Sequence, residues 1–179
     1  MAGNEKLFAI LALQQSVAGA LEDDADLANG RSDIFRKFLA VSAASRLEQD
    51  TKKTLRELMR DISGQQREML VNFIEQKVLK RGCHALFNRN DNNANSFYAS
   101  CGDDFSQFMR QKAAADEGFG DAVCAFVNLG HDRNQLVHND LASSEFNLSV
   151  NDVEGRFRRA AIFLPQFRQY ALEFARRQA

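Results

Sequence analysis

The stretch VNDVEGRFRRAAIFLPQFRQYALEFARR, at residues 150–177, has the clearest periodicity in the sequence. Apolar residues recur in it at alternating steps of three and four, a spacing that places them on one face of a helix. The residues on this face are Val150, Val153, Phe157, Ala160, Leu164, Phe167, Ala171 and Phe174. Pro165 lies inside the pattern and predicts a kink, because it removes one backbone hydrogen bond and crowds the carbonyl group of Ala161. The stretch therefore predicts one long helix with a buried face.

The ends of this predicted helix carry the residues that helix termini favour. Asn147 or Ser149 can act as the N-cap, because a short polar side chain can accept a hydrogen bond from the first free N–H groups. Asp152 and Glu154 follow in the first turn, and residues 176–177 place two arginines in the last turn. Acids at the start and cations at the end both complement the helix dipole.

Helical periodicity also dominates the rest of the sequence. It predicts further helices over residues 5–22, 34–59, 65–80, 103–114 and 117–137. Asn29-Gly30 predicts a break between the first two, after which Ser32 or Asp33 would cap the second helix. The periodicity weakens over residues 82–102, where residues 88–93 predict a polar loop. Since no window alternates β-branched and polar residues, the fold class is predicted to be all-α.

The composition fits a single helical domain over residues 1–179. Hydrophobic residues make up 45% of the chain and charged residues 26%, which is ordinary for a globular protein. A single Pro and ten Gly leave few obligatory breaks, and fifteen Phe without any Trp predict a core packed by Phe. The apolar run from Leu7 to Leu13 follows only one Lys, so it predicts an amphipathic helix and not a signal peptide. No run reaches the about 18 apolar residues of a membrane span, so we expect a cytoplasmic protein without membrane contact.

Most catalytic and metal-binding patterns are missing from the sequence. No two histidines lie four residues apart, and no glycine-rich loop precedes a Lys-Ser or Lys-Thr pair. Cys83, Cys101 and Cys124 are odd in number and widely spaced, which indicates reduced thiols and not disulfides or a zinc site. Cys83 and His84 are neighbours, but adjacent residues of a helix point in different directions, so we expect no nucleophile–base pair there. We expect no cofactor and no metal ion.

The remaining candidate for chemistry is LGHDRNQLVHND, at residues 129–140. Arg133 is a permanently charged, forked donor suited to a phosphate group, and His138 can exchange a proton near neutral pH. Such a pair can cleave RNA without a metal ion. The His deprotonates the ribose 2′-hydroxyl or protonates the leaving oxygen, and the Arg stabilises charge on the phosphorane. The structural alternative is an Arg at a helix end beside a capping His.

The spacing within this segment raises a geometric question. Asn134 and His138 are four apart and share a helix face, whereas Arg133 and His138 are about 140° apart around an ideal helix. Arg133 and His138 can converge if the helix ends near His138, or if a two-fold axis brings Arg133 of one subunit beside His138 of another. Asp132, directly before Arg133, is expected to be solvated.

The segment RNQLVH, at residues 133–138, resembles the R-x(4–6)-H motif of HEPN domains, many of which have a polar residue directly after the Arg, as Asn134 is here. The motif precedes a short polar loop at residues 139–149 and then the long final helix, which is also its place in HEPN domains. FRKFLAVSAASRLEQDTKKTL, at residues 35–55, resembles the long second helix of the RiboL-PSP-like HEPN branch. The resemblance covers most of the chain and implies an up-and-down α bundle of about five to seven helices.

This resemblance also implies an activity. Arg133 and His138 would be the catalytic pair of a metal-independent endoribonuclease that leaves 2′,3′-cyclic phosphate and 5′-hydroxyl ends, with Asn134 orienting His138 or the phosphate. HEPN sites commonly form in a dimer cleft, so the resemblance implies a homodimer through the motif face, with RNA as substrate. It also suggests a toxin–antitoxin or phage-defence setting, with an antitoxin or defence-system partner. The alternatives are a non-catalytic HEPN module that binds nucleotide, RNA or a protein partner, and a helical interaction domain.

The charge distribution is uneven, although the net charge is only −1. Residues 46–81 contain nine Lys and Arg against six acids, and residues 151–179 contain six Arg against three acids. Residues 82–121 contain three bases against six acids. If the two basic segments flank the motif, they would attract RNA to it. The alternative is that these charges form the solvated faces of long helices.

Overall fold

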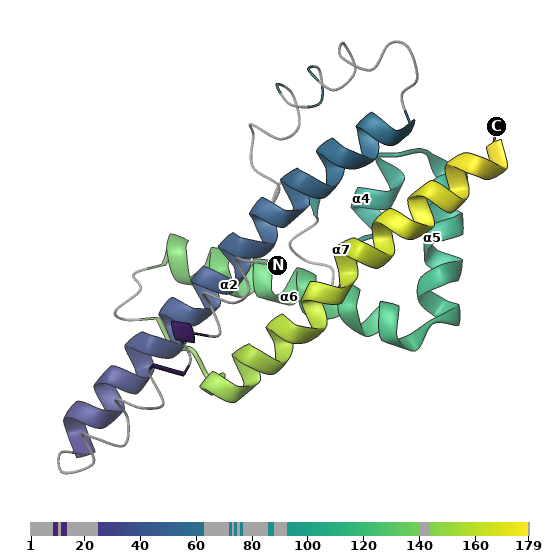
Figure 1. Cartoon of the computed structure of the whole chain (residues 1–179). Coiled ribbons are helices and arrows are strands. Elements are labelled where there is room, and N and C mark those ends of the chain that lie inside the picture. The colour runs from purple at the N-terminus through teal and green to yellow at the C-terminus, as the bar shows by residue number, and fades with distance from the viewer. Residues whose placement is uncertain are drawn as a thin grey trace.

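The computed structural model describes residues 9–10, 12–13, 25–62, 72, 74, 76, 86–87, 93–139 and 144–178. Regular secondary structure in these ranges is helical, and five helices are assigned there (Figure 1). They are α2 (Ala25–Ile62), α4 (Asn95–Ala99), α5 (Asp103–Ala115), α6 (Glu117–His138) and α7 (Val150–Gln178). The all-α prediction is therefore confirmed. Most of the predicted helices at 5–22 and 65–80, and of the loop at 88–93, lies outside the described residues.

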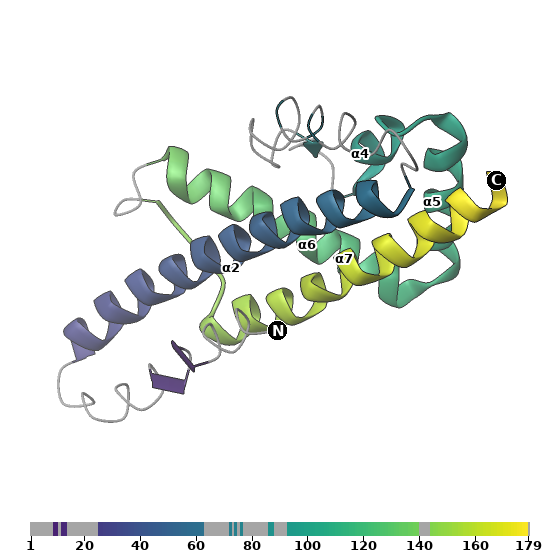
Figure 2. The same cartoon turned by 45° about the horizontal axis from the view of Figure 1, so that its top comes forward.

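Three long helices form the body of the described fold. α2 and α7 lie side by side, and α6 packs against both of them (Figures 1 and 2). α6 runs antiparallel to α7, because Phe119 near its start contacts Tyr170, whereas Asp132 near its end contacts Arg156. α5 packs against α4, α6 and α7. Asp132, in the half of α6 that carries the sequence motif, thus contacts the second turn of α7.

α2 begins earlier than the sequence predicted. The helix starts at Ala25 and continues through Asn29-Gly30, so the predicted break is wrong. A glycine inside a helix costs only about 1 kcal/mol relative to Ala, which the helical residues on both sides can offset. Asp33 is not a cap but an interior residue, and its carboxylate accepts Arg36 and Lys37, each at 2.6 Å, from the next turn. These pairs stabilise the helix where we expected it to start.

The last three helices follow the predicted boundaries closely, and the sequence also predicted the N-cap of α7. In α7 the backbone N–H of Asp152 donates to Ser149 Oγ at 3.1 Å, and the backbone N–H of Ser149 donates to Asp152 Oδ2 at 2.9 Å. This reciprocal pair is a capping box, so the prediction of Ser149 as a cap is confirmed. α7 continues through Pro165 as one helix, and the kink expected there stays a prediction. The N-cap of α6 is Asp116, whose Oδ1 accepts the backbone N–H of Phe119 at 3.1 Å.

A short helix that the sequence did not predict, α4, lies in the region of weak periodicity. Its first turn forms where Asn93 Oδ1 accepts the backbone N–H of Asn95 at 2.9 Å. The helix buries Phe97 and Tyr98 almost completely. Gly102 separates it from α5 with a φ of 104°, a left-handed conformation that L side chains rarely adopt. Two aromatic side chains therefore fix this segment, although it is too short to show a period.

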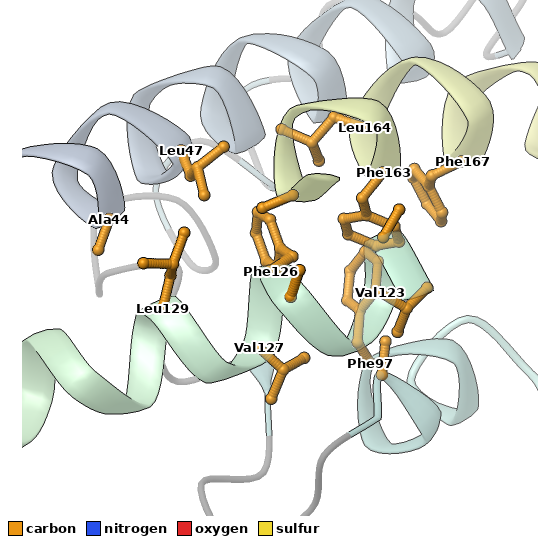
Figure 3. Packing of buried hydrophobic residues seen from close by; sticks show 14 of the residues in the cluster. Ala44, Leu47, Phe97, Val123, Phe126, Val127, Leu129, Phe163, Leu164 and Phe167 are labelled. Carbon is orange, nitrogen blue, oxygen red and sulfur yellow. The ribbon is translucent and has the colours of Figure 1, made fainter. Parts of the chain in front are cut away.

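The core is packed largely by Phe, as the composition predicted (Figure 3). Phe163 is fully buried, and its ring lies 4.8 Å from Phe126 and 6.0 Å from Phe119, between the centroids. At the other end of the cluster, Ala44 and Leu47 of α2 face Leu129 of α6. Most of the predicted α7 stripe is buried as well, namely Val153, Phe157, Ala160, Leu164, Phe167 and Ala171. No stretch of the described helices combines the length and apolarity that a membrane crossing requires.

Candidate functional site

The predicted site residues lie on the last two turns of α6. The helix continues through His138, and the backbone N–H of Asn139 donates to the Gln135 carbonyl at 3.0 Å. Arg133, Asn134 and His138 therefore keep helical spacing. His138 is exposed at the helix C-terminus, an end where cations are favoured.

Arg133 lies on the side of α6 that faces the bundle. It is four residues after Leu129 and three before Leu136, both of which are buried in the core. Its side chain is half-buried, and its Nη1 donates to Asn134 Oδ1 at 3.1 Å. Its Nε–H is buried and has no hydrogen-bond partner among the described residues. An unsatisfied buried donor costs about 1–3 kcal/mol, and the Nε–H of Arg168 is in the same state.

Asn134 is the polar residue of the motif that the fold buries most, with 7% of its surface exposed. Its side-chain oxygen holds the guanidinium of Arg133. The sequence suggested that Asn134 would orient His138 or a phosphate, whereas the contact present orients Arg133. The Asn134 amide thus limits the orientations that the Arg133 guanidinium can adopt.

Arg133 and His138 do not meet within one chain. No hydrogen bond joins them in the described part of the molecule, and the helix keeps them about 140° apart. The helix ends at His138 itself, as the first route to convergence supposed. Convergence of the two side chains, within one chain or through a second subunit, stays a prediction. Val137, which precedes His138 in the sequence, is 48% exposed, so the end of this helix carries an exposed apolar side chain beside the exposed His138.

Asp132 is paired and not solvated, which corrects the expectation from the sequence. Its Oδ2 accepts Arg156 Nη1 from α7 at 2.5 Å, and the side chains are 16% and 23% exposed. Burial raises the pKa of the Asp132 carboxyl above its usual range, although the positive charges of Arg156 and His131 act to lower the pKa. The sequence analysis did not identify Arg156. The feature that could have indicated it is its position next to Phe157, at the edge of the buried face of α7.

Most of the cations that the structure describes in the two basic segments are paired with acids. On α2, Arg46 pairs with Asp50 at 2.7 Å, and Arg168 of α7 bonds to Asp61. Further pairs within a helix are Lys52–Glu48, Lys53–Glu57, Arg158–Glu154 and Arg177–Glu173. Arg159, one turn after Arg156, is exposed. The excess of positive charge is therefore spread along the described helices, and Arg158 and Arg159 are both exposed cations that follow Arg156 on α7.

These features define the protein as an all-α helical bundle in which one helix ends in an Arg-Asn…His segment against a partly buried ion pair. Comparisons with protein-family models, with curated proteins and with solved structures found no match. Among the described residues, no three His, Cys, Asp or Glu side chains gather closely enough to hold a metal ion.

Proposed function

We propose that this protein is a metal-independent endoribonuclease of the HEPN type, which acts as a cytoplasmic homodimer in a toxin–antitoxin or phage-defence setting. The observation that carries the proposal is the state of Arg133. Its guanidinium is half-buried, oriented by Asn134, and has a buried Nε–H without a partner. This state supports the proposal, because a forked donor that is partly removed from bulk water binds a phosphate more strongly than one in water.

In the proposed reaction, His138 takes the proton from the ribose 2′-hydroxyl or gives a proton to the leaving 5′-oxygen. The 2′-oxygen forms a bond to phosphorus as the bond from phosphorus to the 5′-oxygen breaks, which leaves a 2′,3′-cyclic phosphate and a 5′-hydroxyl. Arg133 stabilises the charge that develops on the phosphorane oxygens. Because His138 is exposed, it can reach a substrate held by another subunit.

The alternative is a HEPN-like module that binds RNA, nucleotide or a protein partner without cleaving RNA. The observation in its favour is that Arg133 and His138 point about 140° apart on one helix. In this alternative the Arg133–Asn134 pair would bind a phosphate, and no proton would be transferred.

The test is an RNA cleavage assay in EDTA with end-group analysis. His138→Ala and Arg133→Ala should each lower kcat by about 10²–10⁴-fold, the usual contribution of acid–base catalysis. Arg133→Lys should also lose most cleavage, because an ammonium group keeps the charge but cannot donate the two parallel hydrogen bonds of a guanidinium. Gln135→Ala, an exposed position on the same turn, is the matched control and should keep wild-type activity. Wild-type cleavage by His138→Ala, or loss of cleavage in EDTA, would contradict the proposal.

A mixing experiment tests the dimeric site separately. Dimers that combine an Arg133→Ala subunit with a His138→Ala subunit hold one intact pair if the site forms across the two-fold axis, and none if it forms within a chain. Recovery of cleavage on mixing the two inactive variants is therefore expected. Failure to recover, or a monomer in light scattering with full activity, would contradict the dimeric site.

A further inference from the structure

The contact between Asp132 and Arg156 is the feature that joins the motif-bearing half of α6 to α7. Arg156 Nη1 lies 2.5 Å from Asp132 Oδ2, and both side chains are largely covered. Among the described ion pairs, Lys112–Glu173 joins α5 to α7 and Arg168–Asp61 joins α2 to α7. Asp132–Arg156 is the one in this set that joins α6 to α7.

This ion pair adds a directional contact near the end of α6, whereas the hydrogen bond from the Tyr170 hydroxyl to Asp116 Oδ2 at 3.0 Å does so at the N-cap of the same helix. Phe119, Phe126 and Phe163 fill the seam between α6 and α7, and these close-packed rings already limit the rotation of one helix against the other. A charged hydrogen bond between partly buried groups tolerates little rotation, because a partly buried carboxylate is costly unless its partner stays in place. The pair therefore adds to the contacts that fix the rotation of α6 about its own axis, at the end that carries the motif.

That rotation decides where the predicted site residues point. Consecutive residues of a helix point about 100° apart. With Asp132 held toward Arg156, Arg133 must face the bundle beside Leu129, where its Nε–H is buried. His138 then falls on the opposite, exposed side of the helix.

We propose that Asp132 and Arg156 are positioning residues, which hold the end of α6 so that Arg133 keeps its half-buried, Asn134-bound state. Their role in cleavage rests on the proposed function, but the structural part of the inference does not. A displacement of about 1 Å in a catalytic group can cost up to about 10²-fold in rate. Loss of the pair should therefore lower kcat by about 10- to 100-fold and change KM little.

The experiment compares Asp132→Asn and Arg156→Gln with the double exchange Asp132→Arg/Arg156→Asp. The control is Glu173→Gln, which removes a partner of Lys112 on the same helix α7 but at its other end. The first readout is kcat and KM on RNA. The second is the NMR signal of the Arg133 side-chain Nε–H, assigned by its absence from Arg133→Lys and followed by hydrogen exchange. Circular dichroism confirms that each variant keeps its helix content.

We expect each single variant to lower kcat and to shift the Arg133 signal with faster exchange. The double exchange should restore both, and Glu173→Gln should change neither. An unchanged Arg133 signal in both single variants, or a kcat loss no larger than in the control, would overturn the inference. If the wild-type protein cleaves no RNA, the proposed function fails, whereas the Arg133 signal still decides whether the ion pair positions the motif.

Discussion

Replacing Phe163 by Ala tests the packing that holds α6 against α7. Phe163 is 0% exposed, and its ring lies within 6.0 Å, centroid to centroid, of Phe119, Phe126 and Phe167. Removing a fully buried ring loses its transfer free energy and leaves a cavity, so the free energy of unfolding should fall by about 3–5 kcal/mol. At about 2–4 °C per kcal/mol for a chain of this size, Tm should fall by about 6–20 °C.

Urea unfolding followed by circular dichroism, at equal protein concentrations, measures this loss. The matched control is Ile162→Ala, one position earlier on α7, where 46% of the residue is exposed. A surface substitution of this kind should change the free energy of unfolding by about 0.5 kcal/mol or less. The slope of the unfolding free energy against urea should stay constant, which shows that stability and not compactness has changed. A loss below about 1 kcal/mol for Phe163→Ala, or equal losses in the two variants, would refute the packing argument.

Three further predictions concern the helix cap and the tyrosines. Ser149→Ala should lower the free energy of unfolding by about 0.5–2 kcal/mol in the same urea assay, whereas Asn147→Ala, which removes an exposed side chain, should leave it unchanged. Hydrogen bonds from Ser149 lower the pKa of Asp152 below 3.8, so this carboxylate contributes stability above pH 3.8 that is lost as the pH falls through its folded pKa. Ser149→Ala should weaken that acid dependence, and an unchanged acid profile would argue against the cap. Burial raises the pKa of Tyr98, and burial with a hydrogen bond to Asp116 raises the pKa of Tyr170. Ultraviolet titration should therefore give each tyrosine a midpoint above pH 10.0 in the folded protein and a lower midpoint once the chain is unfolded. A midpoint at or below pH 10.0 in the folded protein would contradict the burial of Tyr98 or the contacts of Tyr170.

The sequence predicted the helices in which apolar residues repeat over several turns. The apolar stripe of α7 spans the whole helix, and its N-cap at Ser149 belongs to a local pattern that needs no tertiary contact. The boundaries of α5 and α6 are also local, because residues 115–117 carry the end of one helix and the cap of the next. These features were predictable because their causes lie within a few residues of the feature.

The elements that sequence reasoning missed depend on contacts from elsewhere in the chain. α4 has five residues and shows no period, and it is fixed by Phe97 and Tyr98 packing on the ring of Phe167. The early start of α2 had no signal of its own, since Asn29-Gly30 is a turn signal in most contexts. In both places tertiary packing or neighbouring turns outweighed the local preference.

In the candidate site, residues 132–134 include both kinds of feature: some that the local sequence predicts, and one that depends on a distant contact. The sequence identified Arg133 and Asn134 by residue type and spacing, and the structure adds that they bond to each other. It could not identify the partner of Asp132, because Arg156 is 24 residues away and meets it only when α7 folds back along α6. A carboxylate next to an Arg in sequence suggests a solvated pair, whereas helix geometry sends the two side chains about 100° apart, to different neighbours. If the ion pair positions the motif as proposed, the direction of Arg133 depends in part on the α6–α7 interface, and substitutions of Arg156 on α7 should alter the orientation of a motif that lies on α6.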